Sequence, residues 1–208
     1  MHPNPAYRQQ PQAGALDLAR ERGFGALTVA GPDGVLAAHV PFVLAGDLLA
    51  AHLVRSNPLA RHLKGGPAAA LMIVTGPDGY ISPDWYGEED RVPTWNYVAV
   101  HLRGRLRLID EAGLRACLDR LAAIFEARLA PKPPWKTDKM TPEVLARLMR
   151  QIVPVEMEIE SVDSTFKLNQ NGPDSSRLGA AAGLAAGGTP GMETAALAAL
   201  MREADVQE

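Results

Sequence analysis

Residues 97–108 read YVAVHLRGRLRL, and this stretch decides the fold class that the sequence predicts. Apolar and polar side chains alternate strictly along it. The apolar positions are Val98, Val100, Leu102, Leu106 and Leu108, and the positions between them carry His101, Arg103, Arg105 and Arg107. A period of two is that of a β-strand with one buried face and one polar face. Residues 153–162, VPVEMEIESV, alternate in the same way, so the sequence predicts a second strand with two unlike faces.

The charged faces of these two strands have opposite signs. Glu156, Glu158 and Glu160 form an acidic stripe on the second strand, whereas the first strand carries three arginines. If the two strands are neighbours, the stripes form a cross-strand ladder of ion pairs. The alternative is that the arginine stripe is a face for phosphate groups or nucleic acid.

Shorter strands, turns and helices surround this pair. Strands are expected at residues 24–30, 35–44, 48–54 and 68–75. The sequence GPDG occurs at 31–34 and at 76–79, and both copies predict a turn, since Pro has the φ that a turn needs and Gly tolerates a positive φ. Helices are expected at residues 15–22, 58–64, 112–129, 141–151 and 192–203. Strands in meander order predict a mainly β fold with α: a small antiparallel barrel with peripheral helices.

The composition excludes several classes of protein. The chain has 208 residues and a formal net charge of −3, and no apolar run approaches the ~20 residues of a membrane-spanning helix. Cys117 is the single cysteine, which excludes a disulfide framework within the chain and a thiolate zinc site. The five histidines do not cluster at metal-ligand spacing, so we expect no metal. The N-terminus has no secretory signal pattern, so we expect a cytoplasmic protein with no membrane partner.

The stretch HLVRSNPLARHL, which begins at His52, is the strongest candidate for a binding site. Asn57 is a preferred N-cap and Pro58 a preferred first helical residue, so a helix begins there at the end of a strand. A helix start favours an anion. The side-chain donors beside it are Arg55, Ser56 and Arg61. The alternative is an ordinary capped surface helix with solvated arginines, since capping alone explains the Asn-Pro pair.

Aromatic residues gather in the segment between residues 80 and 97. ISPDWY and VPTWNY contain Trp85 and Trp95, and such residues either form the wall of a site for a planar ligand or fill the core. His39 lies on a strand next to Pro41, which removes a backbone donor and predicts an edge or an irregularity there. His39 is either packed or directed to a ligand. Cys117 lies on the apolar face of its helix and is expected to be a buried structural thiol.

Five blocks of sequence, taken in order, resemble the PaiB-like proteins. They are HVPFVL from His39, HLVRSNPLARHL from His52, YISPDWY from Tyr80, VPTWNYVAVHLRG from Val92 and KLNQN from Lys167, and Met1, Pro5 and Tyr7 fit the family's N-terminal motif. The resemblance implies an FMN-binding split β-barrel. It also implies a homodimer with two flavin sites at the subunit interface.

The resemblance also implies where FMN binds. The phosphate is expected at the helix start near Asn57 and the flavin ring along residues 39–42, with Trp95, Asn96 or Lys167 supplied by the partner subunit. The expected cofactor-binding residues are His39, Val40, Pro41, Phe42, His52, Arg55, Ser56, Asn57, Arg61, Trp95, Asn96, Lys167 and Gln170. Neither the motifs nor the resemblance identifies a catalytic residue.

Two classes of function follow. The resemblance implies a negative transcriptional regulator that binds FMN. The alternative is a flavin-dependent oxidoreductase, a flavin reductase or an enzyme similar to pyridoxamine-phosphate oxidase, so whether the chain is an enzyme stays open. A weaker third possibility is flavin storage. No helix-turn-helix pair is evident and the net charge is negative, so DNA is expected as a partner by resemblance only.

The sequence predicts two regions. Residues 1–178, which the resemblance covers, are expected to form the FMN-binding split-barrel domain. Residues 179–208 begin with GAAAGLAAGGTPG and are expected to be a flexible Gly/Ala linker followed by a C-terminal helix.

Overall fold

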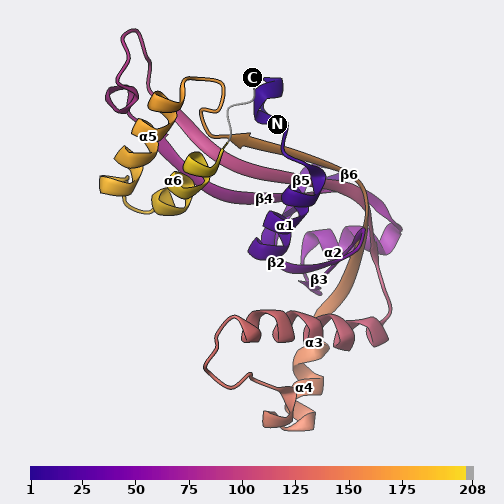
Figure 1. The fold of residues 1–208 in the computed structure, drawn as a ribbon. Coiled ribbons are helices and arrows are strands. Elements are labelled where there is room, and N and C mark those ends of the chain that lie inside the picture. Colours follow the sequence, from indigo (N-terminus) through magenta and orange to yellow (C-terminus); the bar gives the residue numbers. More distant parts are fainter. Residues whose placement is uncertain (205–208) are drawn as a thin grey trace. The chain divides into compact units, whose positions relative to one another are not determined.

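The computed structural model describes residues 1–204 of the chain, and for Glu111 it describes the backbone alone (Figure 1). Six strands form a closed barrel in the order β1-β2-β3-β6-β5-β4. They are β1 (Phe24–Gly31), β2 (Gly34–Ala45), β3 (Leu48–Val54), β4 (Ala68–Ile81), β5 (Thr94–Leu108) and β6 (Ile152–Lys167). The α-helices are α1 (Gln12–Arg22), α2 (Pro58–His62), α3 (Glu111–Ala127), α4 (Pro142–Met149), α5 (Asp174–Gly187) and α6 (Thr194–Glu203). Short 3-10 turns are η1 (Pro5–Tyr7), η2 (Leu63–Gly65), η3 (Pro83–Tyr86) and η4 (Thr137–Lys139). The expected mainly β barrel with additional helices is confirmed.

The described chain divides into two compact units. The first contains residues 1–18, residues 75–101 and the residues from Asp163 onward, and the second contains residues 19–74 and 102–162. The three long strands β4, β5 and β6 each contribute residues to both units. This division is made by packing and does not follow the expected boundary after residue 178, which stays a prediction.

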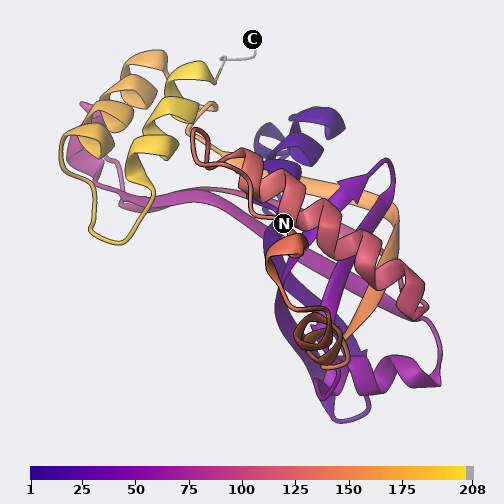
Figure 2. The ribbon, with the colours of Figure 1, turned by 90° about the horizontal axis from the view of Figure 1, so that it is seen from below.

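Helix α5 occupies most of the segment that was expected to be a flexible linker. In the first unit, Leu184 of α5 is buried together with Leu197 and Met201 of α6. Figures 1 and 2 show the two helices side by side. The linker expectation was wrong because the segment is rich in alanine, which favours helix strongly, and because two helices can bury each other's small residues. Residues 205–208, the end of the expected C-terminal region, lie outside the described residues.

The two GPDG sequences adopt different structures. At residues 31–34 the expected turn joins β1 to β2, with Gly31 paired to Gly34 and Gly34 at a φ of 128°. At residues 76–79 the expected turn is wrong, because these residues lie inside β4. Gly76 and Gly79 are packed closely there: a Cβ on Gly76 would lie 3.0 Å from the Val98 Cβ, and one on Gly79 would lie 3.2 Å from Leu184 and Leu197. The two glycines of the second copy therefore allow β4 to pack closely against β5, α5 and α6.

The second unit contains the expected meander. Strand β2 pairs with β1 from Gly34 to Pro41 and with β3 from Phe42 to Ala45. Helix α3 packs on β2 and β3 (Figure 2). Its N-cap is Asp110, which accepts a hydrogen bond from Gly113 N at 3.0 Å. Cys117 is buried on the apolar face of α3, against Val43 and Ala50, and its burial raises the pKa of the thiol.

Strands β5 and β6 are neighbours in the barrel, and this satisfies the condition for the expected charge ladder. Arg107 Nη2 lies 3.0 Å from Glu156 Oε2, which forms one rung. The arginines of β5 are exposed and alternate with buried Leu102 and Leu106, so the strict alternation in the sequence does separate two faces. The ladder interpretation of the arginine stripe is supported by this rung.

Candidate functional site

In the second unit, strand β3 leads through a tight turn into α2, and the capped helix start expected there is present. Asn57 has an extended backbone, and its Oδ1 accepts a hydrogen bond from Leu59 N at 2.9 Å. Pro58 is the first helical residue and Arg61 N donates to Asn57 O at 3.1 Å. The sequence folds this way because Asn replaces a missing acceptor and Pro needs none.

The same geometry limits what the helix start offers an anion. Pro58 has no N–H group and the Leu59 N–H is already bonded to the Asn57 side chain, so the first two amides of this five-residue helix are missing or used. The exposed side chains of Ser56 and Arg61 remain as donors at this turn. A phosphate here would be held chiefly by side chains, and only weakly by the helix dipole.

Arg55 has a structural role that the sequence did not reveal. Its Nε donates to Arg150 O at 2.8 Å and its Nη2 donates to Ile152 O at 3.2 Å, while its own N–H bonds to Gln151 O at 2.8 Å. Arg55 thereby fastens the turn before α2 to the start of β6. The Nε and Nη2 groups of Arg55 are therefore already bonded to backbone carbonyls, and fewer of its N–H groups are left for a phosphate.

The expected ring segment, residues 39–42, presents alternate side chains to opposite faces of β2. Val40 and Phe42 are buried in the core, so they can meet a ligand only through their backbone atoms. His39 is exposed and stacks on Phe24, with ring centroids 6.3 Å apart and planes at 27°. The Phe24 side chain is 54% exposed, so this stacked pair is an aromatic surface open to a planar ligand.

Strand β2 has an open backbone edge beside this surface. Its pairing with β3 extends only from Phe42 to Ala45, so within the described chain residues 39–41 pair with β1 but have no β3 partner on the other side. The ladder opens at Pro41, as the sequence predicts for a proline in a strand. Backbone groups at such an edge can bond to the polar rim of a ring.

His52, on β3, has a buried polar atom without a partner. The Nδ1 of His52 makes no hydrogen bond within the described residues, and its strand neighbour is Pro154, which has no N–H to offer. Burial lowers the pKa of the imidazole below its usual value, so His52 is neutral at pH 7. A buried acceptor or donor without a partner is costly, and a bound ligand would satisfy it. This observation fits a ligand at the expected site.

In the first unit, the structure brings Lys167 and Trp95 together. Lys167 Nζ donates to Thr94 Oγ1 at 2.5 Å and to Trp95 O at 2.8 Å. Its partial burial lowers the pKa of the ammonium group. The Trp95 side chain is 42% exposed, and Tyr80 meets it edge to face with ring centroids 6.2 Å apart. This is a second aromatic surface, with a cation at its base.

Sequence reasoning missed Asp78, which completes this second surface. Trp95 Nε1 donates to Asp78 Oδ1 at 3.2 Å. Asp78 belongs to the GPDG copy inside β4. Because a turn was expected at those residues, Asp78 was not among the candidate site residues. The signal that could have revealed it is the strand pattern on either side of that copy.

Asn96 and Gln170 are placed differently from Trp95 and Lys167. Asn96 is buried on the opposite face of β5, where its Nδ2 donates to Met201 Sδ at 3.6 Å. Gln170 Nε2 donates to Ala6 O at 3.1 Å and to Phe166 O at 2.6 Å, and its Oε1 accepts from Leu168 N. Gln170 also lines a cavity of about 310 Å³ beside the N-terminal segment. Both amides therefore hold the first unit together.

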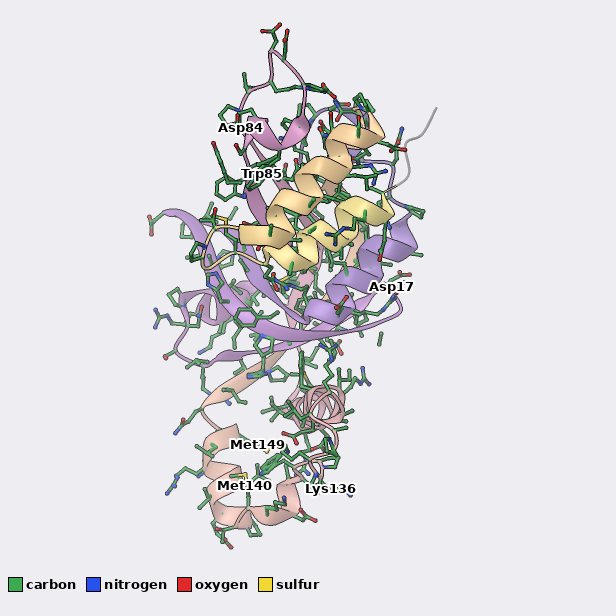
Figure 3. All side chains as sticks on the ribbon, turned by 60° about the vertical axis from the view of Figure 1, so that its left-hand side comes forward. Asp17, Asp84, Trp85, Lys136, Met140 and Met149 are labelled. Atoms are coloured by element: carbon green, nitrogen blue, oxygen red, sulfur yellow. The ribbon has the colours of Figure 1, made fainter. Side chains whose placement is uncertain are left out.

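Trp85 is half-buried and packs against the core of the first unit. It lies beside α5 (Figure 3), where Gly183 has no side chain to obstruct the indole. Any Cβ at Gly183 would overlap the Trp85 ring. The packing of Trp85 favours the core-filling interpretation for that residue, and the exposure of Trp95 leaves its ring open to a ligand.

Two further properties of the described residues concern metal binding and membrane crossing. Residues 1–204 contain no group of three or more His, Cys, Asp or Glu side chains arranged to hold a metal ion. None of the helices in this range combines the length and apolar character that crossing a membrane needs.

Comparison with known proteins identifies the family. Residues 1–161 match a family described as "Putative FMN-binding domain". The chain is 29% identical over 159 residues to protease synthase and sporulation protein PAI 2 of Bacillus subtilis, covering 74% of this chain and 75% of that protein. It is also 33% identical over 119 residues to an uncharacterized protein of Saccharomyces cerevisiae, covering 50% of this chain and 70% of the relative.

Among solved structures, the FAD and heme binding protein of Mycobacterium smegmatis has a similar fold. Its TM-score is 0.56 at 18% sequence identity, and the match covers 77% of this chain and 73% of that protein. The agreement confirms the split-barrel architecture. The chain belongs to the FMN-binding domain family, and FMN, the cofactor that the sequence predicts, is the cofactor of that family.

Proposed function

We propose that this chain is an FMN-dependent negative regulator of transcription that acts as a homodimer. The single observation that carries FMN binding at the expected place is the unpartnered, buried Nδ1 of His52, which lies on the strand that leads into Ser56 and Arg61. The regulatory role is supported by the resemblance to PaiB-like proteins and by the name of the Bacillus subtilis relative, protease synthase and sporulation protein PAI 2.

The FMN phosphate binds at the turn before α2 in this proposal. Ser56 and Arg61 donate to the phosphate oxygens, because both side chains are exposed there while the first two amides of the helix are absent or engaged. Arg55 holds the turn in position through its bonds to Arg150 O and Ile152 O. The phosphate charge thus meets a cation at the surface, where neither is buried unpaired.

The flavin ring lies along residues 39–41 in this proposal. The open edge of β2 supplies backbone groups for the polar rim of the ring, and the stacked His39 and Phe24 side chains give it an aromatic neighbour. The partner subunit's Trp95 and Lys167 close the site from the other side. The exposed aromatic surface on each unit supports a second copy in this proposal, since each surface would otherwise face water.

When bound, FMN supplies reversible electron transfer, and the chain's own residues bind and orient it. Lys167 donates one N–H to Thr94 Oγ1 and another to Trp95 O, so its ammonium group presents a positive charge at a defined place. His52 remains neutral at pH 7 and can donate or accept one hydrogen bond at Nδ1. These residues hold the cofactor without any group that must change its protonation state.

The experiment that tests this function uses the purified full-length chain. We expect a yellow protein with a flavin absorbance spectrum, a dimeric mass by light scattering, and a shift of DNA taken from upstream of its own coding sequence. An unrelated fragment of equal length is the control. A monomer at micromolar concentration, or equal shifts of both fragments, would count against the proposal.

A second candidate function, a flavin-dependent oxidoreductase, is favoured by the exposure of Tyr80 and Trp95. These side chains are 39% and 42% exposed, which leaves room for a second planar molecule beside the flavin. Anaerobic addition of NADH distinguishes the two functions. Bleaching of the flavin within seconds supports the oxidoreductase, and a spectrum unchanged by NADH or NADPH supports the regulator.

A further inference from the structure

Strand β4 carries an acidic side chain at a position held rigidly by packing. Asp78 lies between Gly79 and buried Pro77, inside the second GPDG copy. The glycines at 76 and 79 allow close contact with Val98 and with Leu184 and Leu197. The backbone on both sides of Asp78 is therefore fixed by the core of the first unit, and the carboxylate projects from a rigid base.

Trp95 is held at three points, two on its side chain and one on its backbone, although the residue is 42% exposed. Its indole N–H donates to Asp78 Oδ1 at 3.2 Å. The Tyr80 ring meets it at 71°, edge to face. Its backbone carbonyl accepts from Lys167 Nζ at 2.8 Å. An exposed aromatic side chain normally keeps its rotational freedom, so two restraints on one indole, with a third on its backbone, are typical of a surface prepared for a planar ligand.

Of these restraints, only the bond to Asp78 sets the rotation of the indole about its side-chain torsions. Lys167 acts on the backbone, and Tyr80 offers an aromatic edge that tolerates a range of angles. A carboxylate accepting from an indole N–H is directional and fixes which ring face is turned outward. Removing it would leave Trp95 in place but free to turn.

We propose that Asp78 is a positioning residue of the flavin site: its carboxylate holds the Trp95 indole in the orientation that meets the isoalloxazine ring. This inference rests on the proposed function, in which Trp95 of one subunit faces the flavin bound by the other. Asp78 itself touches neither the flavin nor a reacting atom. Its effect on the cofactor is exerted through the indole.

The test compares Asp78→Ala, Asp78→Asn and Trp95→Phe with the parent. Asp84→Ala is the matched control, since Asp84 is an exposed acid of the same region and its loss changes the charge equally (Figure 3). The full-length protein is labelled with 5-fluorotryptophan, and its three tryptophans give three ¹⁹F signals. Without FMN, we expect Asp78→Ala to move the Trp95 signal alone and Asp84→Ala not to move it.

The second measurement is titration with FMN, following flavin fluorescence. Tryptophan in contact with a flavin quenches it by electron transfer, so we expect the bound flavin to be at least twice as bright in Asp78→Ala as in the parent. The dissociation constant should rise about fivefold, as for one lost hydrogen bond. Asp78→Asn retains an acceptor oxygen and should fall between the two.

The outcomes separate the inference from the function on which it rests. A parent protein that does not bind FMN overturns the proposed function, and the role of Asp78 at a flavin with it. If the parent binds FMN but Trp95→Phe changes neither brightness nor affinity, the aromatic surface is not at the flavin. If Trp95→Phe changes both while Asp78→Ala matches the parent, the indole is oriented by something else and the positioning role is refuted.

Discussion

Replacing Arg61 by alanine should weaken FMN binding about tenfold, and the structure sets this magnitude. The α2 start can contribute little through its amides, because Pro58 has none and Leu59 N is bonded to Asn57 Oδ1 at 2.9 Å. A charge-assisted hydrogen bond contributes ~1.5–3 kcal/mol. Arg61 is exposed, so its bond to phosphate belongs at the lower limit of that range. A loss of ~1.5 kcal/mol corresponds to roughly tenfold in affinity.

The assay is fluorescence titration of the parent and variants with FMN and with riboflavin, which lacks the phosphate. Lys64→Ala is the matched control, because Lys64 is an exposed basic residue of η2, which directly follows α2. We expect Lys64→Ala to bind FMN as the parent does, and the parent to bind riboflavin at least tenfold more weakly than FMN. Arg61→Ala should bind riboflavin with unchanged affinity. Equal affinity of the parent for the two flavins would refute the phosphate placement.

Three further predictions concern stability. Leu184 is 1% exposed in the core of the first unit, so Leu184→Ala should lower the free energy of unfolding, measured by urea denaturation, by ~2–5 kcal/mol. Leu178 of the same helix is 44% exposed, so Leu178→Ala should lower it by less than ~1 kcal/mol. Equally small effects of the two changes would show that α5 is not part of the core. Arg107→Ala removes the partly exposed ion pair with Glu156 and should lower the free energy of unfolding by ~0.2–1 kcal/mol in the same assay, without changing FMN affinity. A large loss of FMN binding would instead show that the arginines of β5 form a ligand-binding face. Burial lowers the pKa of His52 in the folded chain, so the unfolded chain binds its proton more readily and stability should fall as the pH drops below ~6.5. His52→Gln should flatten that part of the stability profile, and a profile identical to the parent's would assign the loss to other groups.

Local signals in the sequence predicted the parts of the fold that local chemistry determines. Asn57 caps α2, because a side-chain acceptor next to free amides has few alternatives. The strict alternation in β5 predicted its two faces correctly. The GPDG copies mark the limit of this reasoning, since the same four residues form a turn at 31–34 and continue a strand at 76–79. The two copies are distinguished only by the packing of Gly76 and Gly79 against residues far away in the chain, and this packing cannot be inferred from spacing in the sequence.

The candidate site was predictable to a similar extent. The exposed Trp95 and its neighbour Lys167 come from blocks that the family resemblance identified, and the structure joins them through a hydrogen bond. The roles of Arg55 and Gln170 were not predictable, because both side chains bond to backbone carbonyls of residues far away along the chain. Asp78 was missed because the sequence around it predicts a turn, whereas the structure places these residues inside strand β4.

The packing of α5 and α6 has a practical consequence for anyone who works with a shortened form of this protein. The family match ends at residue 161, yet Leu184, Leu197 and Met201 lie beyond it and share a core with Ile81 and Val98. A polypeptide cut where the match ends would leave those two strand residues facing water. The end of the family match and the end of what must fold together are therefore different places in this chain, and the second is the one that an expression clone has to respect.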